Sequence, residues 1–271
     1  MTFLRPQVSP VGRLGRAGLG RGFNPARGVG RLLLALTAAL SACGSDTNCL
    51  TSTGPIRTER RELPTGLRSV YASDNVDLIL VQDTVSAPYM EVRAGKNLLS
   101  SLETRVEGDQ LTLTNNARCN WARTYDSPRE VRLHVPHIEN VFLRGSGNIS
   151  TAGQFRQKAI FFHLQSAGDM DLDIQSDYLW IDLYELGDVR VQGQTRELNL
   201  TVDGNGRFFG QNLRARQCYF TTTRGGNGDA HVLATEALGG TIAGNGTVYY
   251  AGNPAYLDLR LTGPGQAQRV P

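Results

Sequence analysis

A short glycine motif recurs along this 271-residue chain and limits its possible folds more than any other feature. It reads GSGN at 145–148, SAGD at 166–169, LGD at 186–188, and GNG at 204–206 and 244–246. If the last glycine of each motif is taken as an anchor, the anchors are Gly147, Gly168, Gly187, Gly206, Gly228, Gly246 and Gly265. A nearly constant step of this length is typical of a chain that coils into a stack of similar units.

Apolar residues alternate with polar ones on both sides of the anchors. Alternation of period two indicates β-strands with one buried face. Each repeat therefore predicts a strand, a glycine turn, a second strand and a polar corner such as QGQTRE at 192–197. Parallel stacking of these units predicts an all-β fold, a β-solenoid (parallel β-helix) with coils of about 20 residues, over residues 65–268. Two positions after an anchor, for example, the chain places Ile149, Met170, Val189, Phe208 and Val248.

The anchor glycines are expected at sharp corners between strands. Glycine accepts positive φ without a Cβ clash, so most of the anchors are predicted to have φ above zero. Asn and Asp often follow the glycine; they tolerate the same backbone region and bond nearby backbone groups. Stacked on one another, they can form ladders along the solenoid. On this basis Gly187→Asn is expected to be milder than Gly187→Val, because a β-branched residue at positive φ is strained.

The repeat blurs in the first half of the sequence. The segment VYASDNVDLILVQ at 70–82 still fits, with Asp74 as its anchor. Residues 102–116 alternate around a glycine–aspartate pair and predict two strands joined by a tight turn. Residues 119–130 have no period and predict a protruding loop.

The N-terminal segment indicates export. Residues 1–31 contain Arg5, Arg13, Arg16, Arg21, Arg27 and Arg31 and no acidic residue, and an apolar run from Leu32 to Leu40 follows. The run is too short to span a membrane core of ~30 Å as a helix. It has the length of a signal-peptide apolar region preceded by positive charge.

The sequence LSAC at 40–43 resembles a bacterial lipobox, in which the cysteine is lipidated and the preceding peptide is removed. The expected organisation is a signal peptide at 1–42, a tether at 43–63 anchored by lipid on Cys43, and a β-solenoid domain at 64–271. An ordinary signal peptide with an incidental cysteine is the alternative.

The remaining cysteines would lie in an oxidising compartment, where disulfides persist. Cys49 and Cys119 both sit in polar, loop-like surroundings and are predicted to form a disulfide. Cys218 precedes a strand-like run and is predicted to be free and buried. The positive charge that gives the chain its net charge of +3 is concentrated in the leader. The rest of the chain therefore lacks the basic composition that is typical of nucleic-acid-binding domains.

No motif for a metal or cofactor site stands out in the sequence. The four histidines are scattered, and no nucleophile elbow, phosphate loop or metalloprotease helix occurs. Asp169, Asp171 and Asp173 fall on one strand face, where three carboxylates either hold a hard cation or simply form a solvated face. No metal, cofactor or catalytic residue is predicted.

Outward aromatic residues are the best sequence clue to a ligand. Tyr178, Trp180 and Tyr184 fall on the outward side of one strand, together with Asp182, and form a possible platform for stacking sugars. Burial under the long loop or at an oligomer contact is the alternative. Other candidates for glycan contact are Trp121, Tyr125, Tyr249 and Tyr256.

The serial GSGN, SAGD and GNG signatures, the closing GNGTVYYAGNP and the early YASDNVDLILVQ resemble the head GIN domain family, described as "putative auto-transporter adhesins" and common in lipoproteins of Bacteroidota. The resemblance covers roughly residues 56–271. It implies a right-handed parallel β-helix, and it transfers no catalytic residues because none is defined for the family.

These observations lead us to expect a non-enzymatic cell-envelope lipoprotein whose β-helical surface serves adhesion, binding or scaffolding. The alternatives are a polysaccharide-binding or polysaccharide-processing β-helix protein and a module that binds peptidoglycan or another envelope protein. The expected location is the outer membrane, through the lipid anchor, on either its periplasmic face or the cell surface. The expected partners are the membrane and a glycan or envelope protein, and not nucleic acid.

Overall fold

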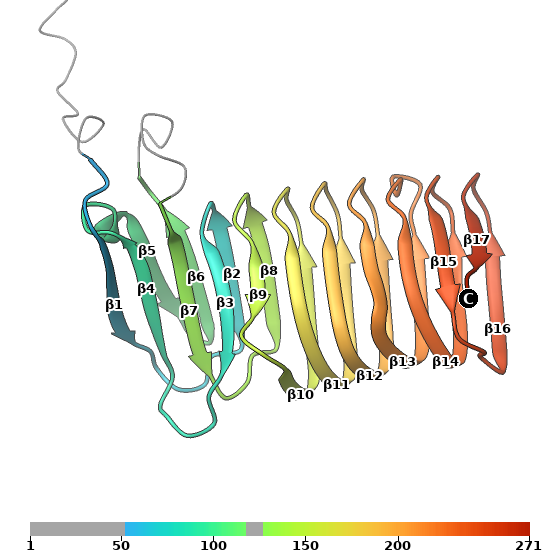
Figure 1. Ribbon diagram of the computed structural model, residues 1–271, viewed down its shortest axis with the longest axis horizontal. Coiled ribbons are helices and arrows are strands. Elements are labelled where there is room, and N and C mark those ends of the chain that lie inside the picture. The colour runs from blue at the N-terminus through green and yellow to red at the C-terminus, as the bar shows by residue number, and fades with distance from the viewer. Residues whose placement is uncertain (1–51, 118–126) are drawn as a thin grey trace, which may run out of the picture. The chain divides into compact units, whose positions relative to one another are not determined.

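Strands fill almost all of the chain that the computed structural model describes, residues 52–117 and 127–271 (Figure 1). The predictions for the signal peptide, Cys43, the Cys49–Cys119 pair, Trp121 and Tyr125 lie outside these residues. Within the described residues, the one helical element is the short 3-10 turn η2 (Leu99–Ser101). No helix of the described residues is long and apolar enough to cross a membrane.

The strands are numbered in chain order. The first group comprises β1 (Ile56–Glu62), β2 (Ser69–Asp74), β3 (Asp77–Gln82), β4 (Tyr89–Gly95), β5 (Leu102–Glu107), β6 (Gln110–Asn115), β7 (Arg129–Val135), β8 (Asn140–Gly145) and β9 (Ile149–Thr151). The second group comprises β10 (Phe155–Leu164), β11 (Met170–Leu183), β12 (Val189–Val202), β13 (Phe208–Thr222), β14 (Ala230–Ile242), β15 (Thr247–Ala251), β16 (Tyr256–Leu261) and β17 (Gln266–Arg269).

The strands from β10 onward form stacked coils, as predicted. Each pairs in parallel with its equivalent in the next coil, and one inward row shows the register: Leu179, Leu198, Cys218, Leu238 and Leu257 are successive partners. The fold is therefore an all-β solenoid with the predicted coil length. Cys218 is free and buried in this row, as predicted, and burial raises the pKa of its thiol to about 12.

Each coil turns at one edge of the stack and bends at the other (Figure 1). The glycine turns separate consecutive strands, whereas the predicted polar corner at 192–197 lies inside β12, which continues through the bend. The prediction of a strand break there was wrong; in β12, Gly193, with φ of 107°, lies within the bend. The strand segments that precede the glycine turns stack into one face of the solenoid, which we call the pre-turn face. The segments that follow the turns stack into the other face, which we call the post-turn face.

The N-terminal coils stack in a different order from their order in the chain. Val70 of β2 pairs with Leu111 of β6 on one side and with Val141 of β8 on the other. The coil β2–β3 therefore lies between β6–β7 and β8–β9. Asp74 pairs with Gly145, not with the anchor two residues further on, so its assignment as the equivalent of the anchors was wrong by two positions. It nevertheless has a positive φ, of 58°.

Antiparallel strands complete the N-terminal end of the stack. β5 and β6 form the predicted hairpin, and β1 pairs with β4, which pairs with β7. β7 begins at Arg129, so the last two residues of the predicted loop at 119–130 belong to a strand.

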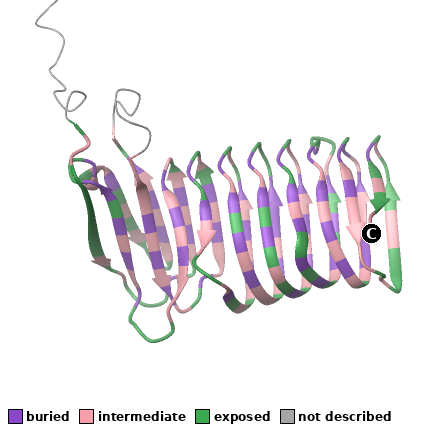
Figure 2. Ribbon diagram, in the orientation of Figure 1, coloured by how far each residue is buried: buried purple, intermediate pink, exposed green. Residues whose placement is uncertain are grey.

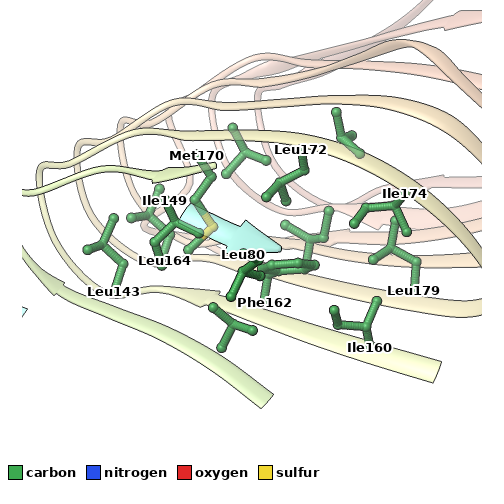
Figure 3. Packing of buried hydrophobic residues seen from close by; sticks show 14 of the residues in the cluster. Leu80, Leu143, Ile149, Ile160, Phe162, Leu164, Met170, Leu172, Ile174 and Leu179 are labelled. Atoms are coloured by element: carbon green, nitrogen blue, oxygen red, sulfur yellow. The ribbon is translucent and has the colours of Figure 1, made fainter. Parts of the chain in front are cut away.

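The core is a continuous column of apolar side chains inside the stack. Buried and more exposed residues alternate along the strands, as the banding in Figure 2 shows. Successive coils place side chains of similar size on one another: Leu143 pairs with Leu164 and Ile149 with Met170 (Figure 3). Each coil thus buries its apolar face mainly against its two neighbours, which is why the units need stacking.

The anchor glycines lie in the turns between strands, but their predicted positive φ was wrong. Positive φ occurs at other glycines, Gly54, Gly66, Gly108, Gly153, Gly193 and Gly252. The physical requirement at the anchors is close approach of the backbone. A Cβ on Gly187 would lie far inside 3.0 Å of the carbonyl oxygen of Gly168, and the same holds at Gly206 over Gly187 and at Gly228 over Gly206. Glycine thus recurs because consecutive turns stack directly on one another.

The Asn and Asp residues after the anchors form the ladder that the sequence suggested. The side-chain oxygen of each accepts the backbone N–H of the equivalent residue in the next coil. Asn148 accepts from Asp169 at 3.0 Å, Asp169 from Asp188 at 2.8 Å, and Asp188 from Arg207 at 2.9 Å. These bonds satisfy backbone donors in the turns, where strand pairing is interrupted.

Candidate functional site

Trp180 lies on the outward side of the pre-turn face, as predicted. It is partly exposed on β11, and its ring centroid is 6.4 Å from that of Tyr178. Tyr184 is 38% exposed but follows the end of β11, beyond Asp182. Since Asp182 is only 5% exposed, the predicted row is not one continuous exposed platform.

Asp182 fixes the orientation of Trp180. The indole Nε1–H donates to one carboxylate oxygen at 2.7 Å, and the other oxygen lies 2.9 Å from Nδ1 of His163. His163 is itself stacked on Phe142, with ring centroids 4.4 Å apart. Burial acts to raise the pKa of Asp182, but hydrogen bonds, including those to His163 and Trp180, outweigh burial and lower the pKa below its ordinary value of 3.8.

A groove opens beside Trp180 where the outward row loses a side chain. The row runs through successive coils as Trp180, Asn199, Tyr219, Gly239 and Asp258. Gly239 has no side chain, and the Tyr219 ring lies over it, 3.3 Å from where a Cβ would stand. The resulting hollow has a volume of about 270 Å³.

We call this hollow the aromatic groove and define it by its outward lining residues. They are Trp180, Asn199, Thr201, Tyr219, Thr221, Gly239, Thr241, Tyr256, Asp258 and Arg260. Three aromatic rings from three strands thus surround a surface of threonine hydroxyls and an asparagine amide. Aromatic side chains offer an apolar ring face together with a polar group, and hydroxyls and amides both donate and accept hydrogen bonds.

The groove brings together some of the predicted residues and adds others. Trp180 and Tyr256 line it, whereas Tyr178 stands next to Trp180 and Tyr184 lies outside the lining. Tyr249 lies on the post-turn face, stacked on His231 at 4.7 Å. Tyr219, the row of threonines and the role of Gly239 were not predicted from the sequence. The coil length contains the signal for them, because successive steps of about 20 residues from Trp180 lead to Asn199, Tyr219 and Gly239.

Two of the three carboxylates at 169–173 are engaged in the structure of the coils, and the third, Asp171, is exposed. Asp169 accepts the N–H of Asp188, and Asp173 accepts side-chain amide hydrogens from Gln154 and Gln192, both at 3.1 Å. Within the described residues no group of three or more His, Cys, Asp or Glu is placed to hold a metal ion.

The Asp182 contacts predict a loss of stability in acid. The pKa of Asp182 is lower in the folded chain than its ordinary value of 3.8, so the unfolded chain takes up a proton first as the pH falls. The stabilisation is therefore present above the unfolded-state pKa and is lost as the pH falls through the folded-state pKa. We expect Asp182→Asn to lower the free energy of unfolding at pH 7 by about 1.5–3 kcal/mol.

Urea unfolding at pH 7 and pH 2 measures this effect. The difference between wild type and Asp182→Asn should be smaller at pH 2 than at pH 7, because lowering the pH moves the wild-type carboxyl towards its neutral form. Glu185→Gln, at an exposed site, is the matched control. An equal difference at both pH values would show that the charge of Asp182 does not stabilise the fold.

Comparison with known proteins gives one family. A family model described as "Putative auto-transporter adhesin, head GIN domain" matches residues 67–254, more than half of the chain. A comparison with curated protein sequences gives no match.

Solved structures share the fold. A putative adhesin from Bacteroides fragilis is 18% identical, with a TM-score of 0.73 over 80% of this chain and 97% of that chain. A putative lipid binding protein from Parabacteroides distasonis is 19% identical, with a TM-score of 0.62 over 80% and 98%. A putative adhesin from Parabacteroides merdae is 17% identical, with a TM-score of 0.56 over 81% and 98%. At these identities the likeness extends to the fold alone.

Proposed function

Because the chain belongs to the head GIN domain family of auto-transporter adhesin-like proteins, we propose that it is a non-enzymatic, adhesin-like protein of the cell envelope that binds glycan through the aromatic groove. The observation that carries the proposal is the lining itself. Trp180, Tyr219 and Tyr256 provide ring faces, and hydroxyl and amide groups stand between them. A sugar ring has apolar faces and hydroxyl groups around its edge. The aromatic rings of the groove can contact the apolar faces, and the hydroxyl and amide groups can bond the sugar hydroxyls.

The groove is preorganised for a ligand. Asp182 holds the Trp180 indole through a 2.7 Å hydrogen bond, so little rotamer freedom remains to be lost on binding. The strands β11 to β14 beneath the groove are each paired in parallel on both sides, and β16 pairs in parallel with β14. A rigid aromatic surface binds with a smaller entropic cost than a flexible one.

The chemistry of the lining favours binding over hydrolysis. Glycosidases generally need two carboxylates flanking the scissile bond. Among the residues that line the groove, Asp258 supplies one carboxylate, and it lies 3.3 Å from a guanidinium nitrogen of Arg260. An acid–base pair is therefore missing from the lining.

Attachment to the envelope forms part of the proposal. Lipid on Cys43, after removal of residues 1–42, would hold the protein at the outer membrane. The tether would be shorter than the expected 43–63, because Ile56–Glu62 form strand β1 and pair with β4. The described solenoid would then stand at the end of that tether as a binding module.

A glycan array followed by titration calorimetry tests the proposal. The protein, purified after expression of the full chain, should bind at least one neutral glycan on the array. Trp180→Ala should weaken binding at least about tenfold, since buried aromatic contacts commonly contribute about 2 kcal/mol or more. Gly239→Val should also weaken binding, because its side chain would displace the Tyr219 ring, which lies 3.3 Å from where a Cβ would stand.

Tyr249→Ala is the matched control, since it removes an outward aromatic residue from the other face. It should bind as the wild type does. Equal binding by wild type, Trp180→Ala and Gly239→Val, with unchanged melting temperatures, would refute the groove as the site.

A further inference from the structure

The coils bend at the edge of the stack opposite the glycine turns (Figure 1). A second hollow runs along this edge. It has a volume of about 710 Å³ and crosses five coils, from β10 to β14. We call it the bend groove and define it by its five basic lining residues, Arg156, Lys158, Arg196, Arg214 and Arg216. All five are exposed.

The positive charge of the bend groove is mostly uncompensated. Asp177 and Glu236 are the acidic residues in the lining. Arg216 pairs with Glu236 at 2.7 Å, but none of the other four basic residues is within 4.0 Å of a carboxylate of the described residues. The described chain as a whole holds more acidic than basic residues, 23 against 20. The groove is therefore a local basic surface on an acidic body.

The basic side chains come from three of the five strands, β10, β12 and β13. Arg156 and Arg214 belong to one row, in which Gln175 and Gln194 lie between them. Neighbouring strands are about 4.8 Å apart, so these two charges, three coils apart, lie roughly 14 Å from each other along the solenoid axis. Such a row suits an extended ligand with repeated negative groups better than a single small anion.

The neutral part of the lining narrows the class of ligand. Between the charges stand glutamine amides and the hydroxyls of Ser176 and Thr235, and no aromatic or aliphatic residue belongs to this lining. Thr195 also belongs to the lining, but it is buried and its hydroxyl donates to the backbone carbonyl of Glu197. Proteins that hold single-stranded nucleic acid usually add aromatic side chains for base stacking. A lipid would need apolar contacts for its chains. A polymer that carries both acid groups and hydroxyls fits this lining best.

We infer that the bend groove binds an acidic polysaccharide, with its carboxylates or sulfates on the arginine and lysine side chains and its hydroxyls on the glutamine, serine and threonine side chains. In this arrangement the polysaccharide chain lies along the solenoid axis. This site is separate from the aromatic groove, and neither depends on the other for its evidence.

Biolayer interferometry with immobilised polygalacturonate and heparin tests the inference. The full chain should bind both at low salt, and binding should weaken as salt rises, because charge contacts are screened. Dextran, which has hydroxyls but no acid groups, should bind at least about tenfold more weakly than polygalacturonate. The double variant Arg196→Glu with Arg214→Glu should lose at least about tenfold in affinity for both acidic polymers.

The control changes the net charge equally elsewhere. Lys96→Glu with Arg224→Glu alters two exposed residues outside the groove lining and should bind as the wild type does. Trp180→Ala should also bind the acidic polymers normally, which separates this site from the aromatic groove.

Three results would overturn the inference. The first is an equal loss in the control double variant, which would mean that net charge alone decides binding. The second is tighter binding of a thymidine oligonucleotide or of phosphatidylglycerol vesicles than of polygalacturonate, with the same sensitivity to the groove variant. The third is no binding of either acidic polymer by a chain with an unchanged melting temperature.

Discussion

Replacing Gly187 by alanine is expected to destabilise the protein by about 3 kcal/mol or more, at the upper end of the usual cost of overpacking. The added Cβ would overlap the carbonyl oxygen of Gly168, a backbone atom that cannot move without disturbing the turn below. For a domain of this size the melting temperature should fall by roughly 6–12 °C. Differential scanning calorimetry of the purified variant measures the shift.

Asparagine separates the two explanations for the repeated glycine. If positive φ were the requirement, Gly187→Asn would be mild, because asparagine tolerates the left-handed region. The overlap with Gly168 instead predicts that Gly187→Asn is as damaging as alanine. Gly153 is the matched control: its φ is 83° and a Cβ there would meet nothing within 4 Å. Gly153→Asn should therefore be tolerated, and a mild effect at both sites would contradict the stacking explanation.

Phe208→Ala should be the most destabilising single truncation in the core, by about 3–5 kcal/mol. Phe208 is fully buried, and its ring fills the space beside Gly210, which lies further along the same inward face. The parallel partner in the next coil is the small residue Ala230. Truncation would leave a cavity that none of these neighbours can fill.

The adjacent Phe209 is the matched control for this truncation. It faces outward, where its ring stacks with His231 at 5.8 Å. Phe209→Ala should lower the free energy of unfolding by no more than about 1 kcal/mol, as is common for surface changes. Guanidinium unfolding of the two variants compares them directly, and equal losses would argue against Phe208 as a core residue.

The fold was predictable because its signal is periodic. A nearly constant step between anchors and strict alternation around each of them define both the coil length and the inward side chains. The order of the first coils was not predictable in this way. Val70 pairs with Val141, which lies far along the chain, and no local pattern records that two coils have changed places.

The reason for the glycines also could not be obtained from local sequence. Both positive φ and close approach require glycine, and they differ only in what surrounds the residue in space. The contact of Gly187 with Gly168 depends on the register between coils. The Asn and Asp ladder, by contrast, could be predicted from the sequence, because a short polar side chain next to each turn has few other hydrogen-bond partners.

The site was only partly visible in the sequence. Trp180 stood out as a large aromatic residue at an outward position. The groove, however, depends on a missing side chain at Gly239 and on Tyr219 one coil earlier. A glycine outside the turn motif gives no signal of its own until the register between coils places it beside Tyr219.

A crystal structure of the protein with a neutral glycan selected on the array tests the central claim most directly. The account predicts a sugar ring on the face of Trp180, with a second contact at Tyr219 and hydroxyls bonded to the threonine row. A glycan bound on the post-turn face, or an intact chain that retains no neutral glycan at all, would contradict it.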